Sequence, residues 1–517
     1  MLIFIVLSVT MLTLFFVSIY FRFRLTYKLW IDQDVPTIPA TFPSGHLDSR
    51  MAYMNFGLIA IDLYKKLKSK GDYVGLFFLN KPVLFVLSPE FAKTVLVRDF
   101  QCFVNRGVYF NRLNDPLSAN LFFIENNDWR RLRLKMTPAF SSGKIKTMFF
   151  TINDVADEMV KHMNERQKNQ NLNSISNSNS NGGFDVEVTD LMARYNTDVI
   201  VSCAFGVHCN SLADPASEFR AIGKKMLTFT RIRLLKLYGA MLFRSTARRF
   251  GFRLLNDDVS KFIIAMCKKT IEERRSKHIE RRDFMQLMID LYRDNTETND
   301  ACSDGLTLED IAAQVFLFFF AGFETSSTAM TYGLYELALN QSVQDKVRCE
   351  IDEISSRHNG KITYDNLMEM TYLDQVIYET MRMHPAVGTL HRVINKDYSL
   401  PNGGIAPKGT YVVVPAVAFH NDPELFPNPQ YFDPDRFSDE NKLKRHPFAY
   451  LPFGEGPRNC IGIRFGMLQT KLGLAMLLKH YRFECCTKTK IPIEIDNVSL
   501  LLLPSGGVWL KAIKVNE

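Results

Sequence analysis

The stretch Phe453–Gly462, FGEGPRNCIG, is the part of the sequence that most constrains the fold. Two glycines flank Cys460, and a stretch with helical character follows from about Ile463 to Leu478. Glycine lets the backbone turn tightly, and a helix N-terminus aimed at a sulfur favours the thiolate over the thiol. The alternative is that Cys460 is only a small buried residue beside a helix cap, as most lone cysteines are.

The joint spacing Phe-x-x-Gly-x-Arg-x-Cys-x-Gly closely resembles the cysteine loop of the cytochrome P-450 superfamily. The resemblance implies that Cys460 is the axial thiolate ligand of iron in a bound haem b, iron protoporphyrin IX. Phe453 is then expected to shield the sulfur from water, and Arg458 to pair with a haem propionate. The loop residues expected to bind the cofactor are Phe453, Gly456, Arg458, Cys460 and Gly462.

A second segment of the same family pattern is Glu379-Thr-Met-Arg382. Its helical spacing puts both charges on one face, and taken alone it predicts only an exposed ion pair. It precedes Pro434–Phe437 and the cysteine loop, which is the order usual in the family. The resemblance therefore implies a structural network of Glu379, Arg382 and Arg436 that holds the haem-binding region in place.

Two further arginines and a tryptophan match the family's partners for the haem propionates. Trp129-Arg-Arg-Leu-Arg133 places Trp129 and Arg133 on one helical face, and both side chains are suitable donors to an anion. Arg392, after the Glu379 helix, matches another propionate partner. His391 beside it is a poorer candidate for a ligand, since a thiolate already accounts for the iron.

One long helix is predicted from Thr307 to about Asn340, because Thr307–Asp310 resembles a capping box and neither proline nor turn signal follows. This is about 33 residues, or on the order of 50 Å. Its centre, Phe316–Gly322, is apolar on every face but too short to span a bilayer, which predicts a helix through a protein core.

Polar residues interrupt this apolar centre at Ala321-Gly-Phe-Glu-Thr325. A carboxylate and hydroxyls at such a place are costly unless hydrogen-bonded or functional. Gly322 lacks a Cβ, so we expect a ligand to lie against the helix there. The family's Ala-Gly-x-acid-Thr stretch is similar and serves oxygen activation, which makes Glu324 and Thr325 the predicted catalytic residues. The alternative for Thr325 is a bond back to the i−4 carbonyl.

The N-terminus is apolar from Leu2 to Phe21 and is followed at once by Arg22 and Arg24. About 20 helical residues span a hydrocarbon core, and the positive-inside rule then places the remainder in the cytosol. A cleavable signal peptide is the alternative, but its basic leading region and cleavage site are missing. We expect a transmembrane anchor over 1–21, a basic and Pro-bearing linker over 22–45, and the haem domain over 46–517. Within the linker, the prolines between Val35 and Gly45 favour a stiff, extended chain.

The composition of the 517 residues fits one large globular haem domain. Apolar residues make up 46 %, and the formal charge of +8 without a dense basic run disfavours nucleic acid. Nine scattered cysteines argue against a disulfide framework. The predicted fold is mainly α with small β-sheets, the cytochrome P-450 fold. Strands are expected at 73–79, 83–87 and 410–414, and a low-complexity loop at 169–183.

The closest resemblance is to insect microsomal, xenobiotic-metabolising members, with a linker poorer in proline than is usual. It implies a monooxygenase of the endoplasmic reticulum membrane that oxidises lipophilic xenobiotics, toxins or endogenous compounds. Electrons come from NADPH through a separate reductase, with cytochrome b5 a further candidate, since no dinucleotide-binding glycine motif is present. Basic residues are expected to face the reductase, namely Arg130, Arg131, Lys135, Lys442, Lys444 and Arg445.

Two other functions fit a haem-thiolate chain. One is an isomerase or dehydratase acting on peroxides, which the Glu324–Thr325 pair disfavours; the other is a haem-based sensor or carrier. The identity of the substrate does not follow from the residues. Positions where the family lines its substrate pocket, each of which could equally be plain core, are Phe110, Phe122, Phe123, Phe319, Ala386 and Val387.

Overall fold

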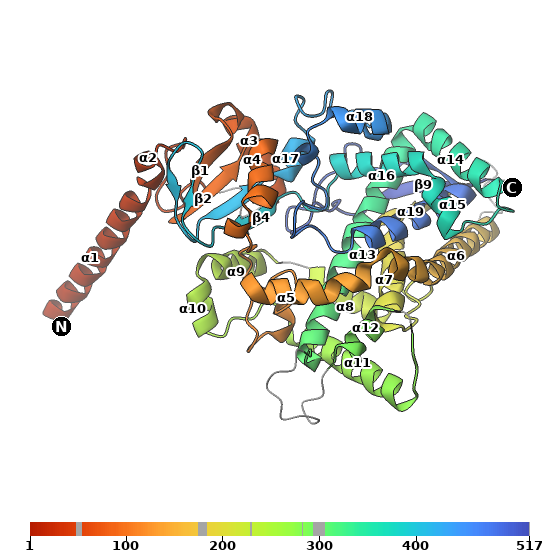
Figure 1. Ribbon diagram of the computed structural model, residues 1–517, viewed down its shortest axis with the longest axis horizontal. Coiled ribbons are helices and arrows are strands. Elements are labelled where there is room, and N and C mark those ends of the chain that lie inside the picture. The colour runs from red at the N-terminus through yellow and green to blue at the C-terminus, as the bar shows by residue number, and fades with distance from the viewer. Residues whose placement is uncertain (48–53, 174–182, 228–229, 282, 293–304, 516–517) are drawn as a thin grey trace. The chain divides into compact units, whose positions relative to one another are not determined.

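The computed structural model describes residues 1–47, 54–173, 183–227, 230–281, 283–292 and 305–515. The chain is mainly helical with small sheets, which confirms the predicted fold class (Figure 1). Two compact units contain 1–107, 387–420 and 446–459 (unit 1), and 108–386, 421–445 and 460–517 (unit 2). Each unit is thus assembled from three separate stretches of chain.

The α-helices are α1 (Leu2–Thr26), α2 (Leu29–Asp32), α3 (Phe56–Leu67), α4 (Pro89–Lys93), α5 (Asn126–Met136), α6 (Ser142–Asn173), α7 (Val188–Phe205), α8 (Glu218–Leu227), α9 (Arg231–Leu242), α10 (Arg244–Arg249), α11 (Asp257–Ser276), α12 (Phe284–Asp290), α13 (Leu308–Leu339), α14 (Gln341–Ser356), α15 (Tyr364–Glu369), α16 (Thr371–Met383), α17 (Ala416–His420), α18 (Asp439–Lys444) and α19 (Ile463–His480). The strands are β1 (Tyr73–Phe78), β2 (Lys81–Val86), β3 (Gly183–Glu187), β4 (Leu390–Val393), β5 (Tyr398–Ser399), β6 (Ile405–Ala406), β7 (Tyr411–Val414), β8 (Tyr481–Cys485) and β9 (Trp509–Lys514).

Unit 1 is built on a four-stranded sheet in the order β1-β2-β7-β4. β1 and β2 form an antiparallel hairpin, while β7 joins β2 in parallel, with Val83 opposite Tyr411. The branched and aromatic residues of β2 and β7 are almost fully buried, as expected for central strands. Helices α3 and α17 pack together in this unit. The predicted strands at 73–79, 83–87 and 410–414 are found with small shifts of their ends.

The first part of the linker between the apolar N-terminal helix and the sheet is helical and packed against β1, ahead of the Pro-bearing part for which extended chain is predicted. α1 continues to Thr26, and α2 follows before any extended chain begins. Trp30 is completely buried, and its indole N–H donates to the carbonyl of Leu76 at 2.8 Å. A Cβ at Gly75 would collide with this ring, so the bare backbone of β1 receives the indole.

Unit 2 is organised around α13, which packs against α7, α11, α16 and α19. The helix begins with a capping box between Thr307 and Asp310, and it matches the prediction within a residue at each end. A three-stranded antiparallel sheet, β3-β9-β8, completes this unit. The predicted loop at 169–183 is shorter, because α6 extends to Asn173 and β3 begins at Gly183; residues 174–182 lie outside the described residues.

Candidate functional site

The first half of the cysteine loop, Phe453–Asn459, belongs to unit 1, and its backbone at Gly456 passes close to that of Leu96. Gly456 has φ +76°, and a Cβ there would collide with the carbonyl oxygen of Leu96. Leu96 lies in a π-helical turn, Thr94–Arg98, directly after α4. Arg458 is buried, and its own carbonyl accepts a hydrogen bond of 2.7 Å from Nη2 of Arg106. Glycine is therefore required at 456 by conformation and by space.

The second half of the loop leads Cys460 to the start of α19. Cys460 is exposed, and Gly462 is the N-cap of the helix. Gly462 has an ordinary φ of −92°, and the nearest atom to a Cβ there would be Phe140 Cε1 at 3.8 Å. Of the two flanking glycines only Gly456 is thus demanded by the backbone. The position before a helix N-terminus agrees with the predicted environment for a thiolate.

Most other described cysteines are in surroundings that oppose ionisation. Burial raises the pKa of the thiols of Cys203, Cys209 and Cys267, to about 12 for the last two. Cys349 is exposed like Cys460, but it lies in the middle of α14. Among the described cysteines, only Cys460 combines exposure with a glycine-rich loop at a helix start.

Helix α5 places Trp129 and Arg133 one turn apart, as predicted. Trp129 is buried and Arg133 is half-buried. Desolvation lowers the pKa of Arg133, while the negative charge of Cys460 raises it. The guanidinium of Arg133 thus interacts electrostatically with the cysteine sulfur in the same unit.

Arg392 on β4 is a buried cation whose partners are incomplete. Its Nη1 donates to the carbonyl of His391 at 2.8 Å, whereas its Nε is buried without a hydrogen-bond partner. No carboxylate within the described ranges pairs with it, and burial lowers its pKa to about 10. Such a group fits an anionic ligand such as a haem propionate.

His391, the neighbour of Arg392, has a hydrogen-bond partner within unit 1. Its Nε2 lies 2.9 Å from the hydroxyl of Thr389. Burial and the neighbouring charge of Arg392 lower its pKa to about 4, so that it stays neutral at physiological pH.

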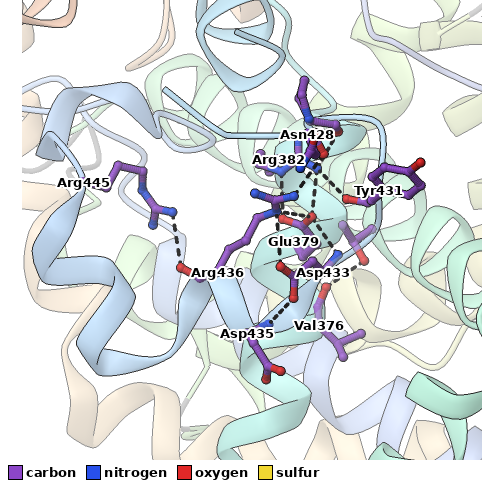
Figure 2. A network of polar contacts seen from close by, with 11 residues as sticks. Val376, Glu379, Arg382, Asn428, Tyr431, Asp433, Asp435, Arg436 and Arg445 are labelled. Atoms are coloured by element: carbon purple, nitrogen blue, oxygen red, sulfur yellow. Dashed lines mark hydrogen bonds and ion pairs between the residues drawn. The ribbon is translucent and has the colours of Figure 1, made fainter. Parts of the chain in front are cut away.

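Glu379, Arg382 and Arg436 are joined as the resemblance implied (Figure 2). Glu379 and Arg382 are completely buried and form a two-bond ion pair, Nε–Oε2 at 2.7 Å and Nη2–Oε1 at 2.8 Å. Nε of Arg436 lies 3.4 Å from Glu379 Oε1. The three charges form one network inside unit 2.

The same network fixes the chain that leads toward α18. Arg382 donates to the carbonyl of Pro429 at 2.8 Å, and the backbone N–H of Asp433 donates to Glu379 at 3.0 Å. Arg436 donates to the carbonyl of Asn428 at 3.0 Å. Figure 2 shows the segment 428–436 wrapped around the ion pair. The buried charges thus have partners on several sides, as buried ion pairs require.

An accessible stripe runs along the otherwise buried centre of α13. Leu317, Ala321 and Thr325 follow one another at intervals of four residues and are half-buried or exposed, while Phe318 and Phe319 between them are buried. A spacing of four keeps side chains on one helical face. The sequence did not single out Ala321, although it is the most accessible position of this stripe.

The role predicted for Gly322 is wrong. A Cβ at Gly322 would collide with the Ile200 side chain of α7, and its backbone carbonyl accepts a hydrogen bond from Gln469 at 2.8 Å. The glycine therefore lets α7 and α13 approach each other, and a ligand would meet Ala321 instead. Ser326, one of the hydroxyls that follow this apolar segment, accepts a hydrogen bond from the same Gln469 side chain.

Glu324 and Thr325 follow directly on this face. Burial raises the pKa of Glu324 to about 7, an effect partly opposed by the positive charge of Arg220. Thr325 Oγ1 donates to the carbonyl of Ala321 at 2.7 Å, which is the i−4 bond that was the structural alternative. The bond uses only the hydroxyl proton, so the oxygen can still accept a hydrogen bond. Arg220 was not foreseen as a neighbour.

The predicted pocket residues divide into accessible and core positions. Phe319 is completely buried and packs on Phe205, Phe219 and Phe323, which favours the alternative of a core residue at this position. The remaining predicted residues are accessible to some degree, with Phe122 and Val387 exposed, and Phe110, Phe123 and Ala386 half-buried.

Three of the six residues of the predicted basic surface are paired with neighbouring acids. Arg131 pairs with Asp128, and Lys442 and Lys444 pair with acidic residues of the first turn of α18. The guanidinium of Arg445 packs over the rings of Phe426 and Phe437. These pairs follow from i,i+3 and i,i+4 spacing, which the charge count did not consider.

Comparison with known proteins matches residues 51–511 to the cytochrome P450 family. The chain is 40% identical to cytochrome P450 6a2 of Drosophila melanogaster over 88% of its length and 89% of the relative's. It is 39% identical to cytochrome P450 6A1 of Musca domestica over 96% of its length and 95% of the relative's. The chain belongs to the cytochrome P450 family.

Proposed function

We propose that this haem monooxygenase uses Cys460 as its thiolate ligand and oxidises lipophilic foreign compounds at a microsomal membrane. Membership of the family makes the chain a monooxygenase with a haem-thiolate cofactor. The observation that carries the assignment of Cys460 is its place: an exposed thiol in a glycine-bearing loop at the start of α19, under the charge of Arg133.

The haem would be held by the residues of the family pattern. Cys460 would bind the iron, with Phe453 beside the sulfur and with Gly456 and Gly462 shaping the loop. Trp129, Arg133, Arg392 and Arg458 would donate to the propionates. The buried, unpaired Nε of Arg392 supports this, since a cation in that position is costly without an anionic partner. When bound, the haem supplies the iron centre at which dioxygen is reduced, with one atom going to the substrate and the other to water.

The chain's own contribution to the chemistry would be the control of protons by Glu324 and Thr325. A carboxyl with a pKa of about 7 can both hold and release a proton near neutral pH. The Thr325 oxygen, whose proton is committed to Ala321, can accept a hydrogen bond from water beside it. Together they would pass protons along the accessible face of α13, with Arg220 tuning the carboxyl.

The substrate would be apolar. The accessible residues near the predicted pocket are aromatic or aliphatic, and Ala321 offers a small surface on α13. Lipophilic xenobiotics or toxins, and endogenous lipophiles, fit such a lining. Glu379, Arg382 and Arg436 would serve as a scaffold, because their charges already satisfy one another.

The membrane and electron partners follow from the N-terminus and from the family. α1 is long and apolar enough to cross a bilayer, and none of its apolar stretch is buried. We infer that it anchors the protein in the endoplasmic reticulum membrane with the globular part in the cytosol, where NADPH–cytochrome P450 reductase would deliver electrons. The compensated charges of Arg131, Lys442 and Lys444 make uncharged contacts an important part of that docking.

A matched pair of threonine variants tests the proton-handling proposal. Thr325 and Thr328 both donate to an i−4 carbonyl at 2.7 Å, but Thr325 lies on the accessible stripe and Thr328 is buried. With reductase and a turned-over substrate, Thr325→Ala should release more hydrogen peroxide and less oxygenated product per NADPH than wild type, because a group that guides protons is lost. Thr328→Ala should stay coupled. Equal coupling in both variants would remove Thr325 from the catalytic residues.

A further inference from the structure

One side chain of α13 ties together two separate segments of unit 2. Tyr332 is completely buried, and its hydroxyl donates to the backbone carbonyl of Leu502 at 3.1 Å. The backbone N–H of Leu502 donates in turn to the carbonyl of Ala386 at 3.0 Å. Burial raises the pKa of Tyr332, so its hydroxyl remains a donor. The Tyr332 hydroxyl is thus linked to the Ala386 segment through the backbone of Leu502.

His384 connects the Ala386 end of these contacts back to Tyr332. It lies at the end of α16, two residues before Ala386, and its imidazole stacks on Tyr332 with centroids 4.2 Å apart and planes at 5°. Its Nε2 lies 2.7 Å from Glu336 Oε1. Glu336 is four residues after Tyr332, so both side chains project from the same face of α13. The carboxylate thus holds the imidazole, and the imidazole holds the phenol ring.

Accessible apolar side chains lie beside this buried tie, the two hydrogen bonds that run from Tyr332 through Leu502 to Ala386. Leu502 is buried, but Leu501 and Leu503 on either side of it are half-buried and Leu500 is exposed. Ala386, at the other end of the tie, is half-buried and is one of the predicted pocket residues. A shift of the Leu502 carbonyl would therefore move apolar surface on both segments at once.

We propose that Tyr332, held by His384 and Glu336, is a positioning residue that sets how large an apolar group the substrate pocket accepts. The inference rests on the proposed function, since it takes Ala386 as part of the pocket wall. Tyr332 would not touch the substrate. It would act through Leu502 and Ala386, whose backbone atoms it fixes.

Tyr335 provides a matched control on the same helix. It is buried like Tyr332, and its hydroxyl also donates to a carbonyl of the C-terminal segment, that of Lys490 at 3.4 Å. It contacts His384 only edge-on, with centroids 6.5 Å apart. Its hydrogen bond does not reach the tie to Ala386, so loss of this hydroxyl has a comparable structural effect without the positioning effect.

The experiment compares full-length, haem-loaded Tyr332→Phe and Tyr335→Phe proteins. Imidazole and N-octylimidazole both ligate haem iron through nitrogen, and only the second has an apolar tail that reports on the pocket. Spectral titration should show that Tyr332→Phe changes the Kd of N-octylimidazole about fivefold, the loss of a net hydrogen bond, with the Kd of imidazole nearly unchanged. Tyr335→Phe should change neither, and Glu336→Gln should give a smaller change in the direction of Tyr332→Phe.

An unchanged N-octylimidazole Kd in Tyr332→Phe, or equal changes in both tyrosine variants, would overturn the proposal. If Tyr332→Phe fails to retain haem, Glu336→Gln decides: a change confined to N-octylimidazole supports the positioning role, and no change refutes it. A wild-type protein without a haem-thiolate spectrum would instead contradict the proposed function, so the two failures are distinguishable.

Discussion

Two buried arginines that lie ten positions apart in the sequence have opposite surroundings. Arg382 is enclosed by Glu379 and by backbone carbonyls, so its charge is satisfied by the protein itself. Arg392 is nearly as buried but keeps an Nε without a partner and has no carboxylate among the described residues. The surroundings of Arg382 are those of a charge with a structural role. The surroundings of Arg392 are those of a charge that is free to pair with an anionic ligand.

The largest expected effect comes from breaking the satisfied pair. Arg382→Ala leaves Glu379 buried with fewer partners, which should lower the free energy of unfolding by about 3–5 kcal/mol whether or not haem is bound. Arg131→Ala is the control, because it removes an exposed i,i+3 pair with Asp128 and should cost at most about 1 kcal/mol. Urea unfolding followed by circular dichroism measures both. Similar losses in the two variants would show that the buried network is not a scaffold.

Removing the incompletely paired arginine should have the reverse pattern. Arg392→Met keeps the length of the side chain but removes an uncompensated charge, so the haem-free protein should be as stable as wild type or more so. The rate of haem transfer to apomyoglobin should rise about tenfold, the equivalent of one lost hydrogen bond to a charged group. A haem-free protein destabilised as strongly as Arg382→Ala would contradict the contrast between the two sites.

Glu324 gives a smaller, pH-dependent version of the same contrast. Burial raises the pKa of Glu324 to about 7 in the folded protein. Between the ordinary pKa of a glutamate and about pH 7, the folded state therefore keeps a proton that the unfolded state has lost. Ionisation of Glu324 therefore lowers stability as pH rises from its ordinary pKa to about 7. Glu324→Gln should match wild type at acid pH and become more stable above pH 7, by up to about 3 kcal/mol. Thermal unfolding across this range tests the sign, and a difference independent of pH would show that the carboxyl is not perturbed.

The sequence was sufficient for features that depend on spacing within one element. The capped helix α13, the Glu379–Arg382 pair and the turn at Gly456 follow from local periodicity and glycine chemistry. Features that depend on which other helix or strand packs against a residue were not predictable from the sequence. Gly322 is explained by Ile200 of α7, the burial of Phe319 by three phenylalanines from α7, α8 and α13, and the burial of Trp30 in α2 by its contact with β1.

The central claim, that Cys460 is the thiolate ligand, is tested most directly by the absorption spectrum of the reduced, carbon-monoxide-bound protein. Wild type and Cys349→Ala, which removes the other exposed described cysteine, should both show the red-shifted Soret band of a haem thiolate. Cys460→Ala should lose that band. Retention of the red-shifted band in Cys460→Ala would show that another group ligates the iron and would contradict the assignment.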